Sequence, residues 1–278
     1  MSDPETWRRQ YMSEPVQLPP EIDTTVPSVA RGYDYALGGK NNFEVDRVAV
    51  DTLFKTFPGV KELALDNRAF LRRGVHYLVA EAGIKQIIDV GSGLPSAGNV
   101  HEVAHAIDPS VRVLYVDIDP IVLAHARALL AENDTTTVIQ ADAAKPESIL
   151  GATETVELID MDRPYAVLLS GILHHLHDEQ DPQGVARTFR EALPSGGYLL
   201  NSNFLDDDDQ RARDLDRDLA VSFGTGRFRT WDEHRAYFEG LEIVDPGLVY
   251  ANDWRPDGHT KVNSPWHGFL SAGIGRKP

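Results

Sequence analysis

The residues best placed for chemistry lie in one segment, Ile87–Asn99, which reads IIDVGSGLPSAGN. An apolar run typical of a buried strand leads into two glycines, Gly91 and Gly93, and then into a helical pattern. This order lets backbone N–H groups and the positive end of a helix face a ligand. The dinucleotide fingerprint requires a third glycine at the position that Ser96 occupies. The segment therefore predicts a ligand-binding turn, and the misplaced glycine argues against pyrophosphate as the ligand.

Carboxylates at the ends of three successive predicted strands indicate what the ligand is. Asp89 lies two residues before the first glycine, where its negative charge suits an ammonium or a sulfonium group. Asp117 ends the next strand and can accept hydrogen bonds from both hydroxyls of a ribose. Asp142 ends the third strand and can accept from an exocyclic adenine amino group, although a turn aspartate without a ligand is the alternative. An ammonium, a ribose and an adenine together describe S-adenosylmethionine, so we group the neighbouring Ile118 and Ala143 with this cofactor site.

A histidine-rich segment, His174–Asp178, follows the fourth predicted strand, whose end at Ser170 and Gly171 is expected to border the methyl group. Imidazole and carboxylate are common metal ligands. Polar groups also gather naturally in a cleft where a helix follows a strand, and we expect no metal. His174 or His175 is the candidate general base, a role that matters when the acceptor is a hydroxyl or a protonated amine.

A second unusual segment, Arg31–Asn42, reads RGYDYALGGKNN and is expected to be a loop. Gly38 and Gly39 favour unusual backbone angles, and Tyr33 supplies a ring for stacking. The pair Gly39 and Lys40 lacks the glycine spacing and the following Ser or Thr of a phosphate loop. We expect a lid that brings Tyr33, Gly38 and Gly39 near the methionine or methyl end of the cofactor, with a plain surface loop as the alternative.

The elements that must position these residues alternate between short apolar runs and helical patterns after Gly83, which predicts βαβ units and a parallel sheet covered on both faces. The predicted strands are Gln86–Val90, Val111–Val116, Thr137–Gln140, Tyr165–Ser170 and Tyr198–Asn201. Helices are expected near Ala97–Ile107, Pro120–Glu132, Pro182–Leu193, Asp206–Phe223 and Trp231–Phe238. Two last runs, Leu241–Val244 and Gly268–Ile274, are candidates to close the sheet.

The chain before this core divides into two parts. Residues 1–27 are rich in proline and have no sustained apolar period, so they are expected to be an arm. Residues 28–83 hold the lid segment and two helical patterns, Glu44–Phe57 and Asp66–Ala82. The cofactor-binding core is expected to occupy residues 84–278.

Composition narrows the partners and the location. The chain has 278 residues, with 27 Lys and Arg against 43 Asp and Glu, and a formal net charge of −16. Such a surface repels polyphosphate and anionic membranes, so neither nucleic acid nor a membrane is expected as a partner. The absence of cysteine excludes disulfides and thiolate chemistry and favours the cytoplasm. No signal peptide is visible, and the longest apolar stretch is too short to cross a bilayer. Nothing in the residues indicates an oligomeric state.

Taken in order and spacing, the motifs DVGSG, VDIDP, QADA and LLSGILHHLHD resemble those of class I S-adenosylmethionine-dependent methyltransferases. More narrowly, GYDYALGGKNNFEVDR, NRAFLRRGVHYL and IDVGSGLPSAGNVHEVA resemble an actinobacterial methyltransferase family, over most of the chain after about Ser28. The resemblance implies an α/β, Rossmann-like sheet of seven strands in the order 3-2-1-4-5-7-6, with the cofactor over the carboxyl ends of strands 1, 2 and 4. The interval from Gly91 to Asp117 exceeds the usual one of roughly twenty residues, so we expect an extended first helix and an extended loop before it.

The sequence therefore predicts methyl transfer from S-adenosylmethionine to a small-molecule acceptor. Nucleic-acid methylation is disfavoured, because the chain has neither an Asn-Pro-Pro-Tyr-type motif nor a cysteine. A non-catalytic protein that binds S-adenosylmethionine is one alternative. A nicotinamide-dependent oxidoreductase is another, since it shares the strand, glycine turn and ribose carboxylate. The identity of the acceptor, and whether its O, N or C atom is methylated, are not indicated by the residues.

Overall fold

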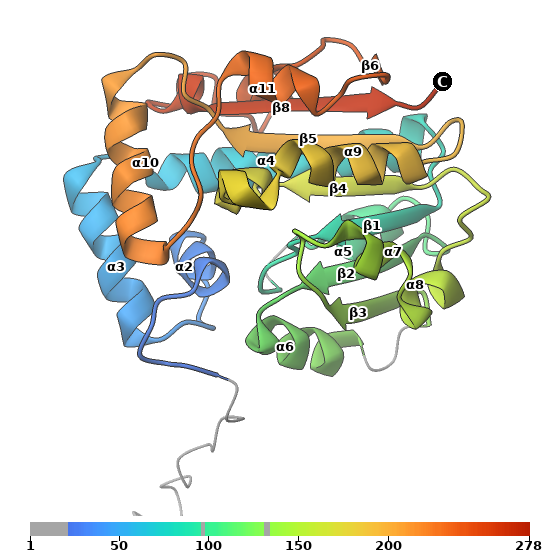
Figure 1. Ribbon diagram of the computed structural model, residues 1–278, viewed down its shortest axis with the longest axis horizontal. Helices are drawn as coiled ribbons and strands as arrows, with labels where there is room; N and C mark the ends of the chain where they lie inside the picture. The colour runs from blue at the N-terminus through green and yellow to red at the C-terminus, as the bar shows by residue number, and fades with distance from the viewer. Residues whose placement is uncertain (1–21, 96–97, 131–133) are drawn as a thin grey trace, which may run out of the picture.

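The computed structural model describes residues 22–95, 98–130 and 134–278. Within them, eight strands form one sheet in the order β3-β2-β1-β4-β5-β8-β6, and β7 pairs with β8 (Figure 1). Strands β1 to β5 run parallel, and β8 is antiparallel to both β5 and β6. This order confirms the predicted class I methyltransferase fold, with β8 in the place of strand 7 and β7 as an addition. Of the predicted arm, residues 1–21 lie outside the described residues.

The strands are β1 (Gln86–Val90), β2 (Arg112–Asp117), β3 (Thr136–Gln140), β4 (Ala166–Ser170), β5 (Tyr198–Phe204), β6 (Glu242–Ile243), β7 (Val249–Tyr250) and β8 (Leu270–Arg276). The α-helices are α2 (Val29–Ala36), α3 (Glu44–Thr56), α4 (Lys61–His76), α5 (Val100–His105), α6 (Pro120–Leu130), α7 (Pro146–Leu150), α8 (Thr153–Leu158), α9 (Pro182–Ala192), α10 (Gln210–Phe223) and α11 (Trp231–Ala236). Shorter turns are the π-helical η1 (Tyr77–Glu81) and the 3-10 turns η2 (Leu173–His175), η3 (Asp178–Gln180), η4 (Ala251–Asp253) and η5 (His267–Phe269). The expected extension of the first helix is wrong: α5 is short, and the added length lies in the loop between β1 and α5.

The central strands are buried on both faces, because consecutive residues are apolar. In β1, Ile87 packs into the layer that contains α4 and α5, whereas Ile88 packs into the opposite layer with α7 and α9. Val113 and Leu114 of β2 divide between the same two layers. A strand with side chains packed on both faces needs a continuous apolar run, which explains why these strands could be predicted from the sequence.

Among the described residues, no helix is long and apolar enough to span a membrane.

The segment before the sheet is helical and contributes to two parts of the fold. Helix α4 packs along one face of the sheet, and Gly74 allows a close approach because a Cβ there would overlap the Leu200 side chain of β5. Helices α2 and α3 stand beyond the carboxyl ends of β4 and β5, beside α10 (Figure 1). The expectation of a loop is wrong for Arg31–Ala36, which belongs to α2. Tertiary contacts stabilise this short helix, including a buried ion pair between Arg31 and Asp46 at 3.0 Å.

Candidate active site

A cavity of about 760 Å³ lies between the carboxyl ends of the strands and the cap, by which we mean residues 22–27 with α2, α3, the first half of α4, and α10. This volume falls within the range of about 300–1,000 Å³ that is typical of small-molecule sites. Of the residues predicted to bind or react, those that line it are Tyr33, Asp89, Gly91, Gly93, Asp117, Ile118, Asp142, Ala143, Ser170, Gly171, His174 and His175. The fold therefore brings residues from five separate segments of the sequence to one cavity.

Gly38 and Gly39 are outside the residues that line this cavity. They end α2 instead: the Gly38 N–H donates to Tyr35 O at 2.9 Å, and the Gly39 N–H donates to Asp34 O at 2.8 Å. Gly38 has a φ of 87°, the left-handed conformation common after a helix. A Cβ at Gly39 would overlap the Asp34 carboxylate. The unusual backbone angle expected of this pair is therefore present only at Gly38, where it terminates a helix, and Gly39 is needed instead for its close approach to Asp34.

The glycine turn after β1 is fixed to β2. The Gly91 N–H donates to Val116 O at 2.7 Å, and the Gly93 N–H donates to Asp117 Oδ2 at 2.8 Å. Both glycines are left-handed, with φ of 69° and 68°. A Cβ at Gly91 would also overlap Ile172 Cδ1, from the segment that follows β4. Gly91 is therefore needed both for its backbone angle and for the approach of Ile172, a contact that the sequence alone did not indicate.

Two buried carboxylates sit beneath this turn. Asp117 is 7% exposed, and its Oδ1 accepts from the Asp119 N–H at 2.9 Å. Asp89 is 4% exposed, and burial raises its pKa to about 7, with Arg68 opposing the shift and Asp117 adding to it. Burial also raises the pKa of Asp117. Ile118, the residue after Asp117, lines the cavity and is 62% exposed, which leaves an apolar surface open there. The site is thus rich in buried negative charge and suits a positively charged ligand.

Asp142 lines the cavity beside β3 and also stabilises its own turn. Its Oδ1 accepts from the Ala144 N–H at 2.9 Å, and Lys145 Nζ lies 3.9 Å from its Oδ2. An aspartate that bonds the backbone two residues ahead is a common turn motif. The carboxylate is partly exposed, so it keeps lone pairs for a ligand.

A chain of hydrogen bonds joins the cap to the ends of β4 and β5. The Tyr33 hydroxyl donates to Ala64 O at 3.0 Å and accepts from Asn67 Nδ2 at 3.2 Å. Asn67 Oδ1 in turn accepts from Ser202 Oγ at 2.6 Å and from Ser170 Oγ at 3.3 Å. Asn67 was not predicted as a site residue. Its signal in the sequence is a polar side chain at the spacing of the buried face of α4.

Asn67 also explains the glycine at the end of β4. A Cβ at Gly171 would lie 3.0 Å from Asn67 Nδ2, and Gly171 has a φ of 73°. A side chain here would press on the amide that links the cap to the sheet.

His174 is positioned by two asparagines of β5. Asn203 Nδ2 donates to Asn201 Oδ1 at 2.6 Å, so Asn203 Oδ1 faces the His174 backbone N–H at 3.2 Å and its Nδ1 at 3.3 Å. The Phe204 N–H also points at Nδ1, at 3.5 Å, so Nδ1 has both an acceptor and a donor beside it. Within the described residues, the buried Nε2 of His174 has no hydrogen-bond partner. The His174 ring stacks on Phe204, with centroids 4.4 Å apart.

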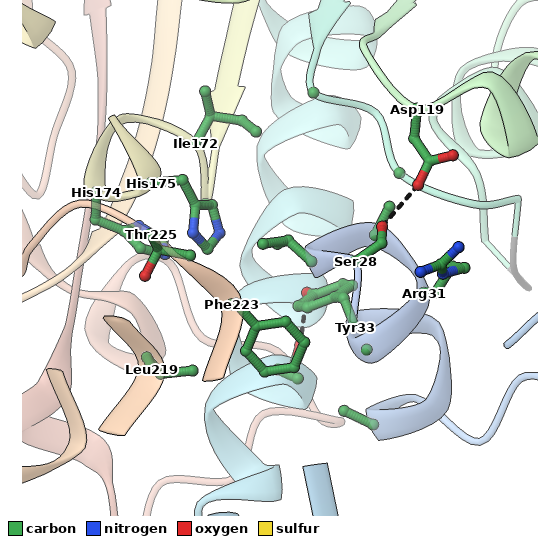
Figure 2. Close-up of a pocket in the computed structure, with 18 of the residues that line it drawn as sticks. Ser28, Arg31, Tyr33, Asp119, Ile172, His174, His175, Leu219, Phe223 and Thr225 are labelled. Carbon is green, nitrogen blue, oxygen red and sulfur yellow. Dashed lines mark hydrogen bonds between the residues drawn. The ribbon is translucent and has the colours of Figure 1, made fainter. Parts of the chain in front are cut away.

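His175 projects into the cavity (Figure 2). Burial lowers its pKa to about 4, and burial together with His175 lowers the pKa of His174 well below the usual value. Both rings are therefore neutral near pH 7 and can accept a proton. Among the described residues, no cluster of His, Asp or Glu has the arrangement to hold a metal ion.

Arg229 organises the turn that carries the two histidines, and sequence reasoning missed it. The side chain is 2% exposed; Nη1 donates to Leu173 O at 2.9 Å and Nη2 to Leu176 O at 2.8 Å. Nη2 also contacts Asp178 Oδ1 at 3.0 Å. These bonds satisfy carbonyls on both sides of His174 and His175. Nothing in the local sequence around Arg229 signals this role, because the carbonyls of Leu173 and Leu176 are distant along the chain and the only local contact is from Nη1 to Arg227 O at 3.1 Å among the described residues.

Comparisons with known proteins identify the family. The family model described as S-adenosyl methyltransferase matches residues 15–278. A crystal structure of a candidate methyltransferase from Thermobifida fusca YX is 44% identical, with a TM-score of 0.90, and the match covers 95% of this chain and 99% of that one. A DUF574 family protein from Streptomyces avermitilis MA-4680 is 37% identical, with a TM-score of 0.88, and the match covers 92% of this chain and 99% of that one.

A more distant match shows the fold alone. An O-methyltransferase family protein from Burkholderia thailandensis is 16% identical, with a TM-score of 0.51, and the match covers 80% of this chain and 61% of that one. A search of curated proteins finds no match to this chain. Because the family model spans nearly the whole sequence and two solved structures agree with it along their full length, the chain belongs to the S-adenosyl methyltransferase family.

Proposed function

We propose that this methyltransferase acts on a small-molecule acceptor, which it holds in the same cavity as the cofactor. The observation that carries the proposal is the continuity of that cavity. It extends from the buried carboxylates under the glycine turn to the neutral histidines after β4 and to the apolar walls of the cap. A donor and an acceptor held in one cavity meet the main requirement of methyl transfer, which is alignment.

The residues at the strand ends fit the cofactor. Asp89 and Asp117 are two buried carboxylates, and the charge of Arg68 acts on Asp89, so a cationic ligand would help to balance the local charge. We assign the methionine part to Asp89 with the glycine turn, the ribose to Asp117, and the adenine to Ile118 with the turn after β3. When bound, S-adenosylmethionine supplies a methyl group on a positively charged sulfur. Ser170 and Gly171 would border that group.

On the acceptor side, we assign His175 the role of proton acceptor, and His174 the alternative. A neutral imidazole can take a proton from a hydroxyl as that oxygen becomes methylated. The linkage from Tyr33 through Asn67 to Ser170 would hold the cap at a fixed position over the strand ends. The cap excludes water from the reacting groups.

A non-catalytic protein that binds the same cofactor is the competing proposal. Two buried ring nitrogens, His174 Nε2 and His175 Nδ1, have no hydrogen-bond partner among the described residues, which favours catalysis over binding alone. A nicotinamide-dependent oxidoreductase is set aside, because the chain belongs to a methyltransferase family. We keep the cytoplasm as the proposed location, since the chemistry assigned here needs no cysteine and the chain has none.

Calorimetry with S-adenosylmethionine and with its demethylated product tests the cofactor site. Asp117→Ala should weaken binding by about 2 to 3 kcal/mol, because two ribose hydroxyls lose charge-assisted hydrogen bonds. Asp232→Ala, at an exposed position of α11, is the matched control and should bind like the parent. Binding of Asp117→Ala within twofold of the parent would contradict the ribose assignment. Transfer of labelled methyl groups into a small-molecule metabolite extract, compared with heat-treated protein, distinguishes catalysis from binding alone.

A further inference from the structure

The part of the cavity under the cap has walls unlike those at the strand ends. Helices α3 and α10 line it with apolar side chains, which are Val50, Leu53, Phe54, Leu215, Leu219 and Phe223. The same helix α10 carries ion pairs on its other faces, such as Arg217 with Asp214 at 2.7 Å. The charged residues of α10 thus point away from the cavity, while residues at i, i+4 and i+8 form an apolar stripe toward it. We call this part of the cavity the apolar chamber.

The ring of Phe223 packs directly against the backbone of Gly32 in α2. A Cβ at Gly32 would lie 2.9 Å from Phe223 Cε1 and Cζ, so the missing side chain of α2 admits the ring. Figure 2 shows Phe223 beside Tyr33. Leu219 lies on the same side of His175 as Phe223, and Ile172 lies on the opposite side of His175. The aromatic wall of the apolar chamber and the imidazole of His175 therefore face one space.

Charged side chains of the described cavity lining lie elsewhere or are already engaged. Asp89, Asp117 and Asp142 belong to the strand ends, and Arg31 is paired with Asp46 at 3.0 Å. Arg68 donates to Asn99 Oδ1 at 3.2 Å and its charge acts on Asp89. Asp119 accepts from the Ser28 hydroxyl and Asp23 from the Thr25 hydroxyl, both at 2.6 Å. Lys61 is exposed at the first residue of α4. An acceptor with its own charge would lose hydration in the apolar chamber without gaining an ion-pair partner there, which disfavours its binding.

We propose that the acceptor is an uncharged molecule with an aromatic or branched hydrocarbon body, which fills the apolar chamber and presents a hydroxyl group to His175. This inference rests on the proposed function. In the transfer, the hydroxyl oxygen gains the methyl group that the donor loses, its proton passes to His175, and the donor sulfur is left neutral. The hydrocarbon body is recognised by burial against Leu219 and Phe223, so hydrophobic area rather than ion pairing sets the affinity.

Binding of a neutral fluorescent probe, N-phenyl-1-naphthylamine, tests the apolar chamber without any need for turnover. We expect one equivalent to bind to the full chain. Leu219→Asp should weaken binding at least tenfold, because it places a carboxylate in the wall. Val221→Asp is the matched control: it introduces the same charge on the same helix at a residue that is 82% exposed, and it should bind within twofold of the parent. Equal binding by Leu219→Asp and Val221→Asp would overturn the proposal.

Three ligands of one size test the acceptor class in the unmodified protein, so the result does not depend on how a variant folds. 1-Naphthol should displace the probe at least tenfold more strongly than 1-naphthoate or 1-naphthylmethylammonium, and it should be the one that gains a labelled methyl group. Equal displacement by all three would overturn the proposed class of acceptor.

Calorimetry with the demethylated cofactor distinguishes failure of this inference from failure of the proposed function. If the probe and naphthol bind but the cofactor does not, the proposed function fails; if the cofactor binds and naphthol has no advantage, this inference fails alone.

Discussion

The Ser28 hydroxyl donates to Asp119 Oδ2 at 2.6 Å and so joins the start of α2 to the loop after β2. Around this bond, Ile22, Ala30 and Phe43 of the cap region pack against a small apolar cluster that includes Leu94 and Ile121. These contacts close the cap over the edge of the cavity nearest the candidate ribose site. These contacts are fewer than those between α4 and the sheet. At this edge the cap is therefore held by the Ser28–Asp119 hydrogen bond and by one small apolar cluster.

Ser28→Ala should loosen the cap without unfolding the core. Loss of a hydrogen bond to a carboxylate costs about 1.5–3 kcal/mol when buried and less where water reaches it, as here. We expect faster amide hydrogen exchange in residues 29–36 and unchanged exchange in β1 and β4. Ser148→Ala, which also removes a hydroxyl bond at 2.7 Å but on α7, should leave residues 29–36 unaffected. Unchanged exchange in α2 of Ser28→Ala would show that the bond does not hold the cap.

Cofactor binding to the parent protein should also protect the amides of residues 29–36 from hydrogen exchange.

Gly91→Ala should reduce cofactor affinity while the chain stays folded. Two penalties act at once: the left-handed backbone costs about 1–2 kcal/mol for a residue with a side chain, and the new methyl overlaps Ile172 Cδ1. Adding Ile172→Ala removes the overlap but not the backbone strain, so the double variant should recover part of the affinity. Calorimetry and thermal melting measure both effects. Full recovery in the double variant would mean that backbone strain at Gly91 does not matter.

Strands and strand-end residues could be predicted because both follow from local pattern. Buried parallel strands need continuous apolar runs, and the carboxyl ends of such strands meet at one edge, so Asp89 and Asp117 were predicted to be neighbours. The prediction fails where distant contacts decide the structure. Helix α2 contains Gly32 and spans only Val29–Ala36, and packing of Phe223 against that glycine gives it a partner from much later in the chain.

The acceptor side of the site was less predictable for the same reason. Helix α10 was predicted as a helix, but not as a wall of the cavity. Its role depends on Leu215, Leu219 and Phe223, whose apolar stripe is narrow among many Asp and Arg residues. Arg229 likewise acts on carbonyl groups more than fifty residues earlier in the chain. A sequence pattern reports the spacing of residues on one element, and these contacts join different elements.

His175→Asn should lower methyl transfer to a hydroxyl acceptor by about 10²–10⁴-fold, the usual contribution of a general base. Affinity for the demethylated cofactor should stay within twofold, because the ring faces the acceptor side. Since the pKa of His175 is lowered to about 4, its protonation should not limit activity of the parent between pH 5.5 and 8. His259→Asn, at an exposed histidine, is the control. If His175→Asn keeps full turnover, the proton acceptor is another group, and His174→Asn is the next variant to measure.

Asp89 should make cofactor affinity depend on pH. Burial raises its pKa to about 7 in the protein without ligand, so the carboxyl is largely protonated at pH 5.5 and must ionise to pair with a cation. Affinity for S-adenosylmethionine should therefore rise by up to about tenfold per pH unit below 7 and level off above it.

The stability of the free protein should change with pH in the opposite sense. A carboxyl whose folded pKa is raised binds its proton more tightly in the folded state, so its contribution to stability falls as pH rises from about 4 to 7. Asp89→Asn should flatten the affinity profile between pH 5.5 and 7.5, measured by calorimetry, and an unchanged slope in that variant would assign the pH dependence to a different group.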